Sequence, residues 1–364
     1  MRMSKAVERT TLQRVLPHYH CSLNNSTVAP LGNGLINSTF LVRSINTNFV
    51  LQKINQHVFP KPGDVVNNAE LINNHLLNKQ TQGQYQLTPM RQIENNDNKV
   101  FSLVDRNYWR AIEYIPNCYT IEAVDTPEQA QQVAAAFAKF THALADFPAQ
   151  ELAVIIPSFH HLGHRLSQLK TAAKSNTNDR LQHCSELLEF CLSEHEFIKS
   201  VAELEASLPL RVTHNDTKIN NLLFCASNNN PTAVIDLDTC MPGFIMHDFG
   251  DMVRTCCSNL PEDGKNIEEM YVREDILSAL AKGYLSELDN HINELEKQSL
   301  VIGAQLLPFM IGIRFLTDFI DGDNYFHTKY EMHNLDRAKN QIKLYSLLKN
   351  IQPKIHDMIY QLSR

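Results

Sequence analysis

The sequence has no excess of basic residues, no uninterrupted apolar run of membrane-spanning length and no Cys-x-x-Cys pair. Lys and Arg total 33 against 40 Asp and Glu, so the net charge is −7. A mildly acidic chain lacks the basic face that general nucleic-acid and anionic-membrane binders need. We therefore expect neither nucleic acid nor a membrane among its partners, whereas a small basic pocket for a phosphate stays compatible with this balance.

The longest apolar stretch, Val301 to Ile313, contains Gln305 and is shorter than the roughly 20 residues of a spanning helix, so we interpret it as a buried helix. The first ten residues hold no apolar core of signal-peptide length. The eight cysteines include the adjacent pair Cys256 and Cys257 and follow no small-scaffold pattern. These features predict reduced thiols in a cytoplasmic protein.

Length and pattern divide the 364 residues into two parts. Strand patterns at 40–43, 48–54, 99–104 and 109–114 dominate the first part, with one helix near Val65–Leu77, and Pro116 and Asn117 end this pattern. We expect an α+β protein of two lobes: a small β-rich N-terminal lobe (1–111) that binds a nucleotide, a hinge (112–117), and a larger, mainly helical C-terminal lobe (118–364).

Helical patterns fill the second part of the chain. Thr126 can cap a helix, Pro127 suits its first position, and Gln129 completes a capping box. Further helices are predicted at 172–207, 268–288, 294–319 and 335–348, around one strand-rich segment, Arg211–Leu237.

That strand-rich segment carries the motif with the most chemistry. His214, Asp216 and Asn221 have the spacing of the kinase catalytic loop, and the next apolar strand ends at Asp236. Phosphoryl transfer needs an acceptor for the substrate's hydroxyl proton and oxygen ligands for magnesium. Asp216 suits the first role, Asn221 and Asp236 suit the second, and Lys218 could neutralise charge on the transferring group.

Other interpretations of these residues stay open. Asp and Asn are common in turns, so an ordinary β-hairpin is the alternative for the motif. Asp238 could ligate a metal or support a ligand. Asp248-Phe249-Gly250 spells the kinase metal motif but comes too late, so we give Asp248 a structural role, holding the catalytic loop. The histidines at 160, 161 and 164 lack a carboxylate or cysteine at zincin spacing and favour a surface or loop cluster over a metal site.

A glycine-rich segment near the N-terminus is a candidate phosphate-binding loop. Glycines let the backbone approach phosphates, and free amides bind anions. A plain hairpin turn would explain the same residues. The candidate residues in this segment are Gly32, Asn33, Gly34, Asn37 and Thr39.

Taken together, these motifs resemble the aminoglycoside phosphotransferase and choline kinase superfamily, and among its members the N-acetylhexosamine 1-kinases. The resemblance spans nearly the whole chain. It rests on the segments 31–34, 50–60, 109–110, 156–160, 214–221, 242–251, 314–319, 322–326 and 334–337. The segment Arg314-Phe-Leu-Thr-Asp-Phe319 is the most specific of them, because general kinase chemistry does not require it.

The resemblance implies a protein-kinase-like bilobal fold and an ATP- and Mg²⁺-dependent kinase that phosphorylates the anomeric hydroxyl of N-acetylglucosamine or N-acetylgalactosamine. It implies Asp216 as the base, Asn221 and Asp236 as magnesium ligands, and Arg314 and Tyr325 at the sugar. Residues 32–39 would cover the phosphates, and Glu113, Ile115 and Leu223 would meet the nucleotide. The protein would be a monomer or a homodimer.

One departure concerns the lysine that many such kinases carry on the third strand for the phosphates. The candidates here are Gln52 and Lys53, which alternation places on opposite faces of the strand. The alternatives in function are a kinase of the same fold for an aminoglycoside, choline, homoserine or methylthioribose, and a non-catalytic pseudokinase. The sequence leaves the gluco or galacto preference and the choice between ATP and GTP open.

Overall fold

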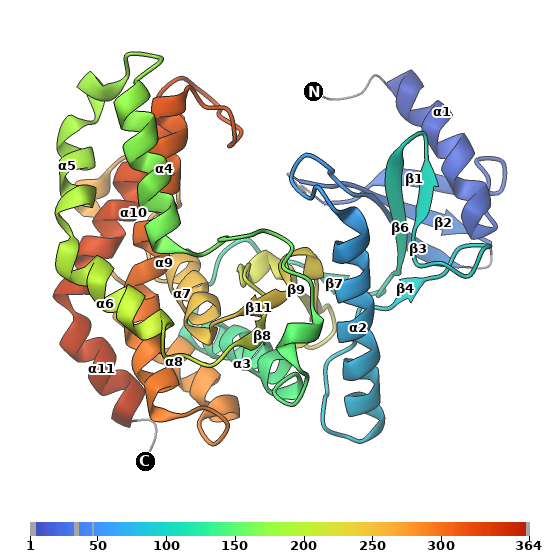
Figure 1. Cartoon of the computed structure of the whole chain (residues 1–364). Coiled ribbons are helices and arrows are strands. Elements are labelled where there is room, and N and C mark those ends of the chain that lie inside the picture. Colours follow the sequence, from blue (N-terminus) through green and yellow to red (C-terminus); the bar gives the residue numbers. More distant parts are fainter. Residues whose placement is uncertain (1–4, 33–35, 46, 362–364) are drawn as a thin grey trace. The chain divides into compact units, whose positions relative to one another are not determined.

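The structure is a computed structural model that describes residues 5–32, 36–45 and 47–361 (Figure 1). The chain forms two compact units. The first consists of Met1–Tyr119, Gln150–Ile156 and Leu223–Met241, and the second of Thr120–Ala149, Pro157–Leu222 and Pro242–Arg364. The strand-rich segment that holds the motif is thus divided between them.

An antiparallel sheet in the order β1-β2-β3-β6-β4, with β5 paired to β6, forms the first unit. Its register aligns Thr39 of β2, Gln52 of β3 and Arg110 of β6 in one row across three strands. The strands are β1 (Ser26–Pro30), β2 (Ser38–Ser44), β3 (Asn48–Lys53), β4 (Gln92–Ile93), β5 (Ser102–Val104) and β6 (Asn107–Glu113).

The two faces of this sheet differ in chemistry, because successive side chains alternate. One face carries Phe40, Phe49, Leu51 and Trp109, which pack with helix α1 (Lys5–Val15) and the 3-10 turn Leu16–Tyr19 into an apolar core (Figure 1). The row Thr39, Gln52 and Arg110 therefore lies on the opposite face.

Other parts of the first unit are a long helix and a hairpin. Helix α2 (Pro62–Thr81) contacts β4, where Gln92 Nε2 donates to Glu70 Oε2 (3.0 Å). Strands β9 (Leu222–Cys225) and β10 (Pro231–Val234) form a hairpin, and β7 (Cys118–Tyr119) pairs antiparallel with β9.

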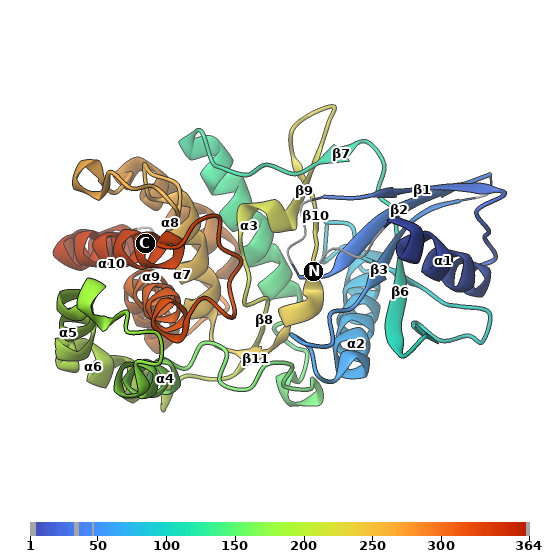
Figure 2. The same cartoon turned by 90° about the horizontal axis from the view of Figure 1, so that it is seen from above.

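Helices dominate the second unit, and the longest of them, α9, lies at its centre among α4, α7 and α10 (Figure 2). A short sheet pairs β8 (Arg211–Thr213) with β11 (Met241–Gly243). The helices are α3 (Pro127–Ala143), α4 (Leu162–Ser175), α5 (Ser185–Ser193), α6 (His195–Glu205), α7 (Ile245–Cys256), α8 (Glu274–Leu288), α9 (Glu294–Asp321), α10 (His333–Asn350) and α11 (Gln352–Gln361).

Helices α7 and α9 touch through their backbones. A Cβ atom on Gly250 would lie 2.2 Å from the carbonyl oxygen of Gly303, and one on Gly303 would lie 2.3 Å from that of Met246. Glycine is required at this crossing because no side chain fits between the two main chains.

The predicted α+β class is confirmed, with a β-rich first unit and a helical second unit. Two local predictions need correction. The stretch 172–207 is not one helical run but the end of α4, then α5 and α6. Thr126 does cap α3 by accepting from the N–H of Gln129, but the Gln129 side chain accepts from the N–H of Asp125, one residue earlier than a capping box requires.

Helix α9 is long and apolar enough to cross a membrane by length and composition, and 83% of its most apolar 18-residue window is buried inside the fold. The prediction of a buried helix at 301–313 is confirmed.

Candidate functional site

The catalytic loop predicted from the sequence follows β8 in the second unit and runs from His214 to Asn221. Lys218 Nζ lies 2.9 Å from Asp216 Oδ1. Asn221, buried in the short helical turn Ile219–Asn221, donates through Nδ2 to the backbone oxygen (2.8 Å) and to Oδ2 (3.0 Å) of Asp216. The loop thus brings together Asp216, Lys218 and Asn221, three of the four residues for which the sequence analysis predicts a role in phosphoryl transfer.

The electrostatics of the loop keep Asp216 ionised. Burial by itself would raise the pKa of Asp216, but the Lys218 ammonium outweighs burial and lowers it. The same pairing raises the pKa of Lys218. Asp216 is therefore a carboxylate at neutral pH and can accept hydrogen bonds. If Lys218 moves away from it, the carboxylate can also accept a proton.

Asp248, at the start of α7, holds the loop from behind. Its carboxylate accepts hydrogen bonds from the backbone N–H groups of His214 (2.9 Å) and Asn215 (2.7 Å), and its backbone oxygen accepts from the Thr217 hydroxyl (2.6 Å). Burial raises the pKa of Asp248 to about 6. These bonds confirm the predicted structural role of Asp248.

The three histidines at 160, 161 and 164 have separate roles. The His160 ring is buried, and its Nε2 lies 3.0 Å from the backbone oxygen of Asn215, a residue at φ 64°. Burial, reinforced by His247, lowers the pKa of His160 well below its usual range, so the neutral ring donates to that oxygen. His161 Nδ1 accepts from the N–H of His164 and caps α4. His160 is thus a second anchor of the catalytic loop.

Arg314, the residue assigned to the substrate, extends from α9 into a group of aromatic rings. Its guanidinium carbon lies 5.4 Å from the ring centre of Phe159, 5.7 Å from Tyr325 and 5.3 Å from Phe326. These distances suit cation–π contacts. Tyr325 is 59% exposed, which leaves one face of this group open to a ligand.

A charged network next to α7 was not predicted from the sequence. Arg254 is buried, with Nε donating to Asp251 (2.7 Å) and Nη1 to Glu262 (2.6 Å), and Arg337 also donates to Glu262 (3.1 Å from Nε). Burial opposes ionisation of Glu262, but the two guanidinium groups lower its pKa to about 2. The i, i+3 spacing of Asp251 and Arg254 was the only signal for this network in the sequence.

The candidate phosphate-binding residues belong to the first unit. Gly32 has a φ of 70°, which favours glycine. Asn37 Oδ1 accepts from the N–H of Asn55 (3.0 Å), and Thr39 Oγ1 accepts from Gln52 Nε2 (3.1 Å). Asn33 and Gly34 lie outside the described residues.

Gln52 and Lys53 lie on different faces of β3. Gln52 points to the face that carries Arg110, and its Oε1 accepts from Arg110 Nε (2.9 Å) and Nη2 (2.7 Å). By alternation, Lys53 lies on the same face of the strand as Phe49 and Leu51, which belong to the core under α1. Of the two candidates, only the uncharged one faces Arg110.

Asp236 and Asp238 follow β10 in the first unit, whereas Asn221 belongs to the second unit. Asp236 is exposed, in the left-handed region at φ 60°. Asp238 is buried, where Oδ1 accepts from Arg110 Nη2 and Oδ2 accepts from Asn37 Nδ2 (2.6 Å). The carboxylate of Asp238 is thus engaged by side chains of the first unit.

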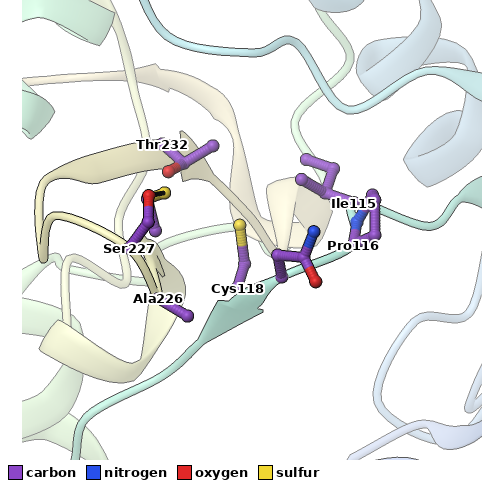
Figure 3. Close-up of a pocket in the computed structure, with 8 residues that line it drawn as sticks. Ile115, Pro116, Cys118, Ala226, Ser227 and Thr232 are labelled. Carbon is purple, nitrogen blue, oxygen red and sulfur yellow. Dashed lines mark hydrogen bonds between the residues drawn. The ribbon is translucent and has the colours of Figure 1, made fainter.

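A pocket of about 500 Å³ lies in the first unit beside the segment predicted as the hinge (Figure 3). Ile115 lines it together with Cys118 and with Ser227 and Thr232 from the hairpin. Glu113 and Leu223 are not among the lining residues. Glu113 is exposed at the end of β6, and Leu223 is half-buried on β9.

Comparison with known proteins identifies the family. The model of the phosphotransferase enzyme family matches residues 27–276, more than half of the chain. A microcompartment-associated aminopropanol kinase is 17% identical, with 97% of this chain and 99% of that chain covered and a TM-score of 0.61. A choline kinase from Cryptosporidium parvum is 16% identical, with coverages of 99% and 100% and a TM-score of 0.59.

A spectinomycin phosphotransferase in complex with ADP and spectinomycin is 10% identical, with 100% of this chain and 99% of that chain covered and a TM-score of 0.53. The TM-scores and coverages of these three structures show a shared kinase-like fold, which confirms that part of the expectation. The family model matches more than half of the chain, and the loop of Asp216, Lys218 and Asn221 agrees with it, so the chain belongs to the phosphotransferase enzyme family.

Proposed function

We propose that this protein is an ATP- and Mg²⁺-dependent kinase that phosphorylates the anomeric hydroxyl of an N-acetylhexosamine to give the sugar 1-phosphate. The observation that carries the proposal is the arrangement of the catalytic loop, in which an ionised Asp216 lies against Lys218 and Asn221. Family membership supports phosphoryl transfer, and the spectinomycin phosphotransferase bound to ADP supports a nucleotide donor.

In this proposal each residue of the loop has one task. Asp216 orients the acceptor hydroxyl and takes its proton late in the transfer, and Lys218 neutralises charge on the transferring group. Because the Asn221 amide donates through Nδ2 to Asp216, its Oδ1 is left as an acceptor suited to a cation. Asn221 Oδ1 and the Asp236 carboxylate would hold Mg²⁺, which supplies charge neutralisation at the phosphates.

The acceptor side of the proposal depends on Arg314. Among the described residues Arg314 has no ion-pair partner, and aromatic rings hold it instead. Lys218 and Arg254 are paired with carboxylates, of Asp216 and of Asp251 and Glu262, so Arg314 is the cation whose charge no carboxylate among the described residues offsets by an ion pair. Such surroundings disfavour a protonated amine and favour a neutral hydroxyl compound, whose polar groups can accept from the guanidinium. The choice of an N-acetylated sugar among neutral acceptors comes from the resemblance of residues 314–319.

The main alternative is a kinase for an amino alcohol or an aminoglycoside. The shared fold with an aminopropanol kinase and a choline kinase makes it the natural second candidate. The exposed Tyr325 and the half-buried Phe159 could cover a quaternary ammonium group, but Arg314 already occupies the space between them.

The test is ADP release with ATP and Mg²⁺ across a panel of acceptors. The panel holds N-acetylglucosamine, N-acetylgalactosamine, their unacetylated parents, kanamycin, choline, aminopropanol, homoserine and methylthioribose, and phosphorus NMR identifies the product. Turnover confined to the acetylated sugars, with an anomeric phosphate, supports the proposal. Turnover only on amines would contradict the acceptor assignment but keep the roles in the loop, and a chain that binds ATP but transfers to none of these acceptors would contradict the proposal.

A further inference from the structure

A guanidinium occupies the face of the first unit's sheet where kinases of known mechanism place a lysine. In protein kinases a lysine on the third strand binds the ATP phosphates and is held by a carboxylate. Here the third-strand residue on this face is Gln52, and Lys53 lies on the opposite face. Arg110, directly opposite Gln52 on the neighbouring strand β6, supplies the cation instead.

We propose that Arg110 is the residue that binds the nucleotide phosphates, with Asp238 as the carboxylate that positions it. This inference rests on the proposed use of ATP. Arg110 as a whole residue is only 2% exposed, and its guanidinium is held on two sides, by Gln52 Oε1 and by Asp238 Oδ1. The side chains of Arg110 and Asp238 are equally buried, at 3% exposure each.

The hydrogen bonds of Arg110 leave part of the group unused. Nε and Nη2 donate to Gln52 and Asp238, whereas Nη1 donates to none of the residues that the structure describes. A guanidinium has five N–H donors in a rigid plane. Nη1 therefore retains two N–H groups that are pre-oriented for a phosphate oxygen, because the other edge of the plane is fixed.

The two partners of Arg110 connect it to other residues that the sequence analysis singled out: Gln52 is a candidate for nucleotide binding, and Asp238 is a candidate metal ligand or supporting residue. Gln52 also donates to Thr39, and Asp238 also accepts from Asn37, and both Thr39 and Asn37 belong to the candidate phosphate-binding segment. Asp238 itself lies two residues after Asp236, the proposed magnesium ligand. One network therefore joins the candidate phosphate loop, the sheet and the segment of Asp236 through a single cation.

A second arginine on the same face provides a matched control. Arg43 alternates with the core residue Val42 and is therefore on the face of Gln52, but it stands opposite Asn48. Asn48 and Gln52 are four positions apart on the strand, or about 13 Å at 3.3 Å per residue. Arg43 is exposed and is too far along the sheet to share a ligand with Arg110.

The experiment measures the binding of Mg-ATP and of adenosine by calorimetry to the full-length chain. R110M should weaken Mg-ATP binding about 10- to 100-fold, as expected for lost hydrogen bonds to a charged group, and leave adenosine binding within about twofold. R43M should bind both ligands like the wild type. Because R110M leaves the buried Asp238 without its cation, R110M/D238N, which removes both charges, is tested alongside with the same expectation.

The relocated cation is the decisive variant. Q52K/R110M places a lysine at the third-strand position and should recover most of the lost ATP affinity, whereas a purely structural role for Arg110 predicts no recovery. Unchanged ATP affinity in R110M, or an equal loss of ATP and adenosine binding, would overturn the inference. A wild-type chain that binds adenosine but not Mg-ATP would overturn it together with the proposed function.

Discussion

Lys218 Nζ lies 2.9 Å from Oδ1 of Asp216, so the proposed base and the proposed phosphate-neutralising cation form one ion pair before any substrate is bound. In this pair Asp216 is a weak base. When the transferring phosphoryl group attracts the ammonium, the carboxylate loses its partner and its affinity for a proton rises. In the proposed mechanism the ion pair would thus couple proton acceptance to the development of charge on the phosphate.

D216N should lower kcat about 10²- to 10⁴-fold, the usual contribution of a general base, and leave Mg-ATP binding within about twofold. The measurement is steady-state turnover on the acceptor found in the panel, with calorimetry for the nucleotide. Turnover near the wild-type level in D216N would remove Asp216 from the mechanism.

K218M should both lower kcat and shift its pH dependence. Lys218 lowers the pKa of Asp216, so its removal raises that pKa and moves the acidic limb of the kcat profile to higher pH. K199M, at an exposed ion pair on α6, is the control and should leave the profile in place. A profile that does not move in K218M would separate Lys218 from Asp216.

Because Asp248 has a raised pKa, we expect acid to lower the activity of the protein but to raise the contribution of this carboxyl group to its stability. Its pKa is raised to about 6 by burial, so the two oxygens that hold His214 and Asn215 are ionised only above that pH. We expect the kcat of the wild type to fall as the pH drops through about 6. In D248N this fall should be absent from the pH profile, and kcat at higher pH should be lower than in the wild type.

For stability the sign is reversed. A carboxyl group whose folded pKa exceeds its unfolded value of about 3.9 contributes to the free energy of unfolding below pH 4, and that contribution is lost as the pH rises through about 6. The shift of roughly two units corresponds to up to about 3 kcal/mol. Urea unfolding of the wild type and D248N at pH 4.5 and 7.5 measures it, and equal pH dependence in both proteins would contradict this assignment.

R314M should raise KM for the acceptor about 10- to 100-fold and leave KM for ATP within about twofold, because the guanidinium is proposed to contact only the acceptor. R314K keeps the charge but loses the planar group that lies 5.4 Å from the ring centre of Phe159 and 5.7 Å from that of Tyr325, and should recover only part of the affinity. A rise in KM for ATP as large as that for the acceptor would indicate a structural role for Arg314.

G303A should destabilise the protein by about 3 kcal/mol or more, since a Cβ atom would lie 2.3 Å from the backbone oxygen of Met246 and the main chain cannot give way cheaply. G63A is the control in another helix, where a Cβ atom meets nothing within 4 Å, and should be neutral or slightly stabilising. Chemical denaturation of both variants tests the difference, and equal stabilities would contradict the backbone contact.

The sequence predicted the catalytic loop because its chemistry is local. Asp216, Lys218 and Asn221 lie within six residues, so their spacing alone indicates that one turn can hold them. The role of Asp248 followed by elimination, and its bonds to His214 and Asn215 bear it out. The helix start at Thr126 was equally local, and only the partner of the Gln129 side chain differed.

What the sequence could not provide depends on register and on distant pairs. Alternation separates Gln52 from Lys53, but only the pairing of β3 with β6 reveals that Gln52 faces Arg110. Arg110 and Asp238 are 128 positions apart, and no pattern in either segment indicates that they meet. The same holds for Arg254 and Arg337, which meet at Glu262 from two different helices.

The glycine crossing of α7 and α9 has an evolutionary consequence. Asp248 belongs to α7 and Arg314 to α9, and at Gly250 and Gly303 the main chains of the two helices approach too closely for any side chain to lie between them. This close contact therefore holds constant the offset between the loop that we propose for transfer and the helix that we propose for binding the acceptor. A lineage can exchange the exposed residues beside Arg314, such as Tyr325, and acquire a new acceptor while the transfer chemistry is inherited intact.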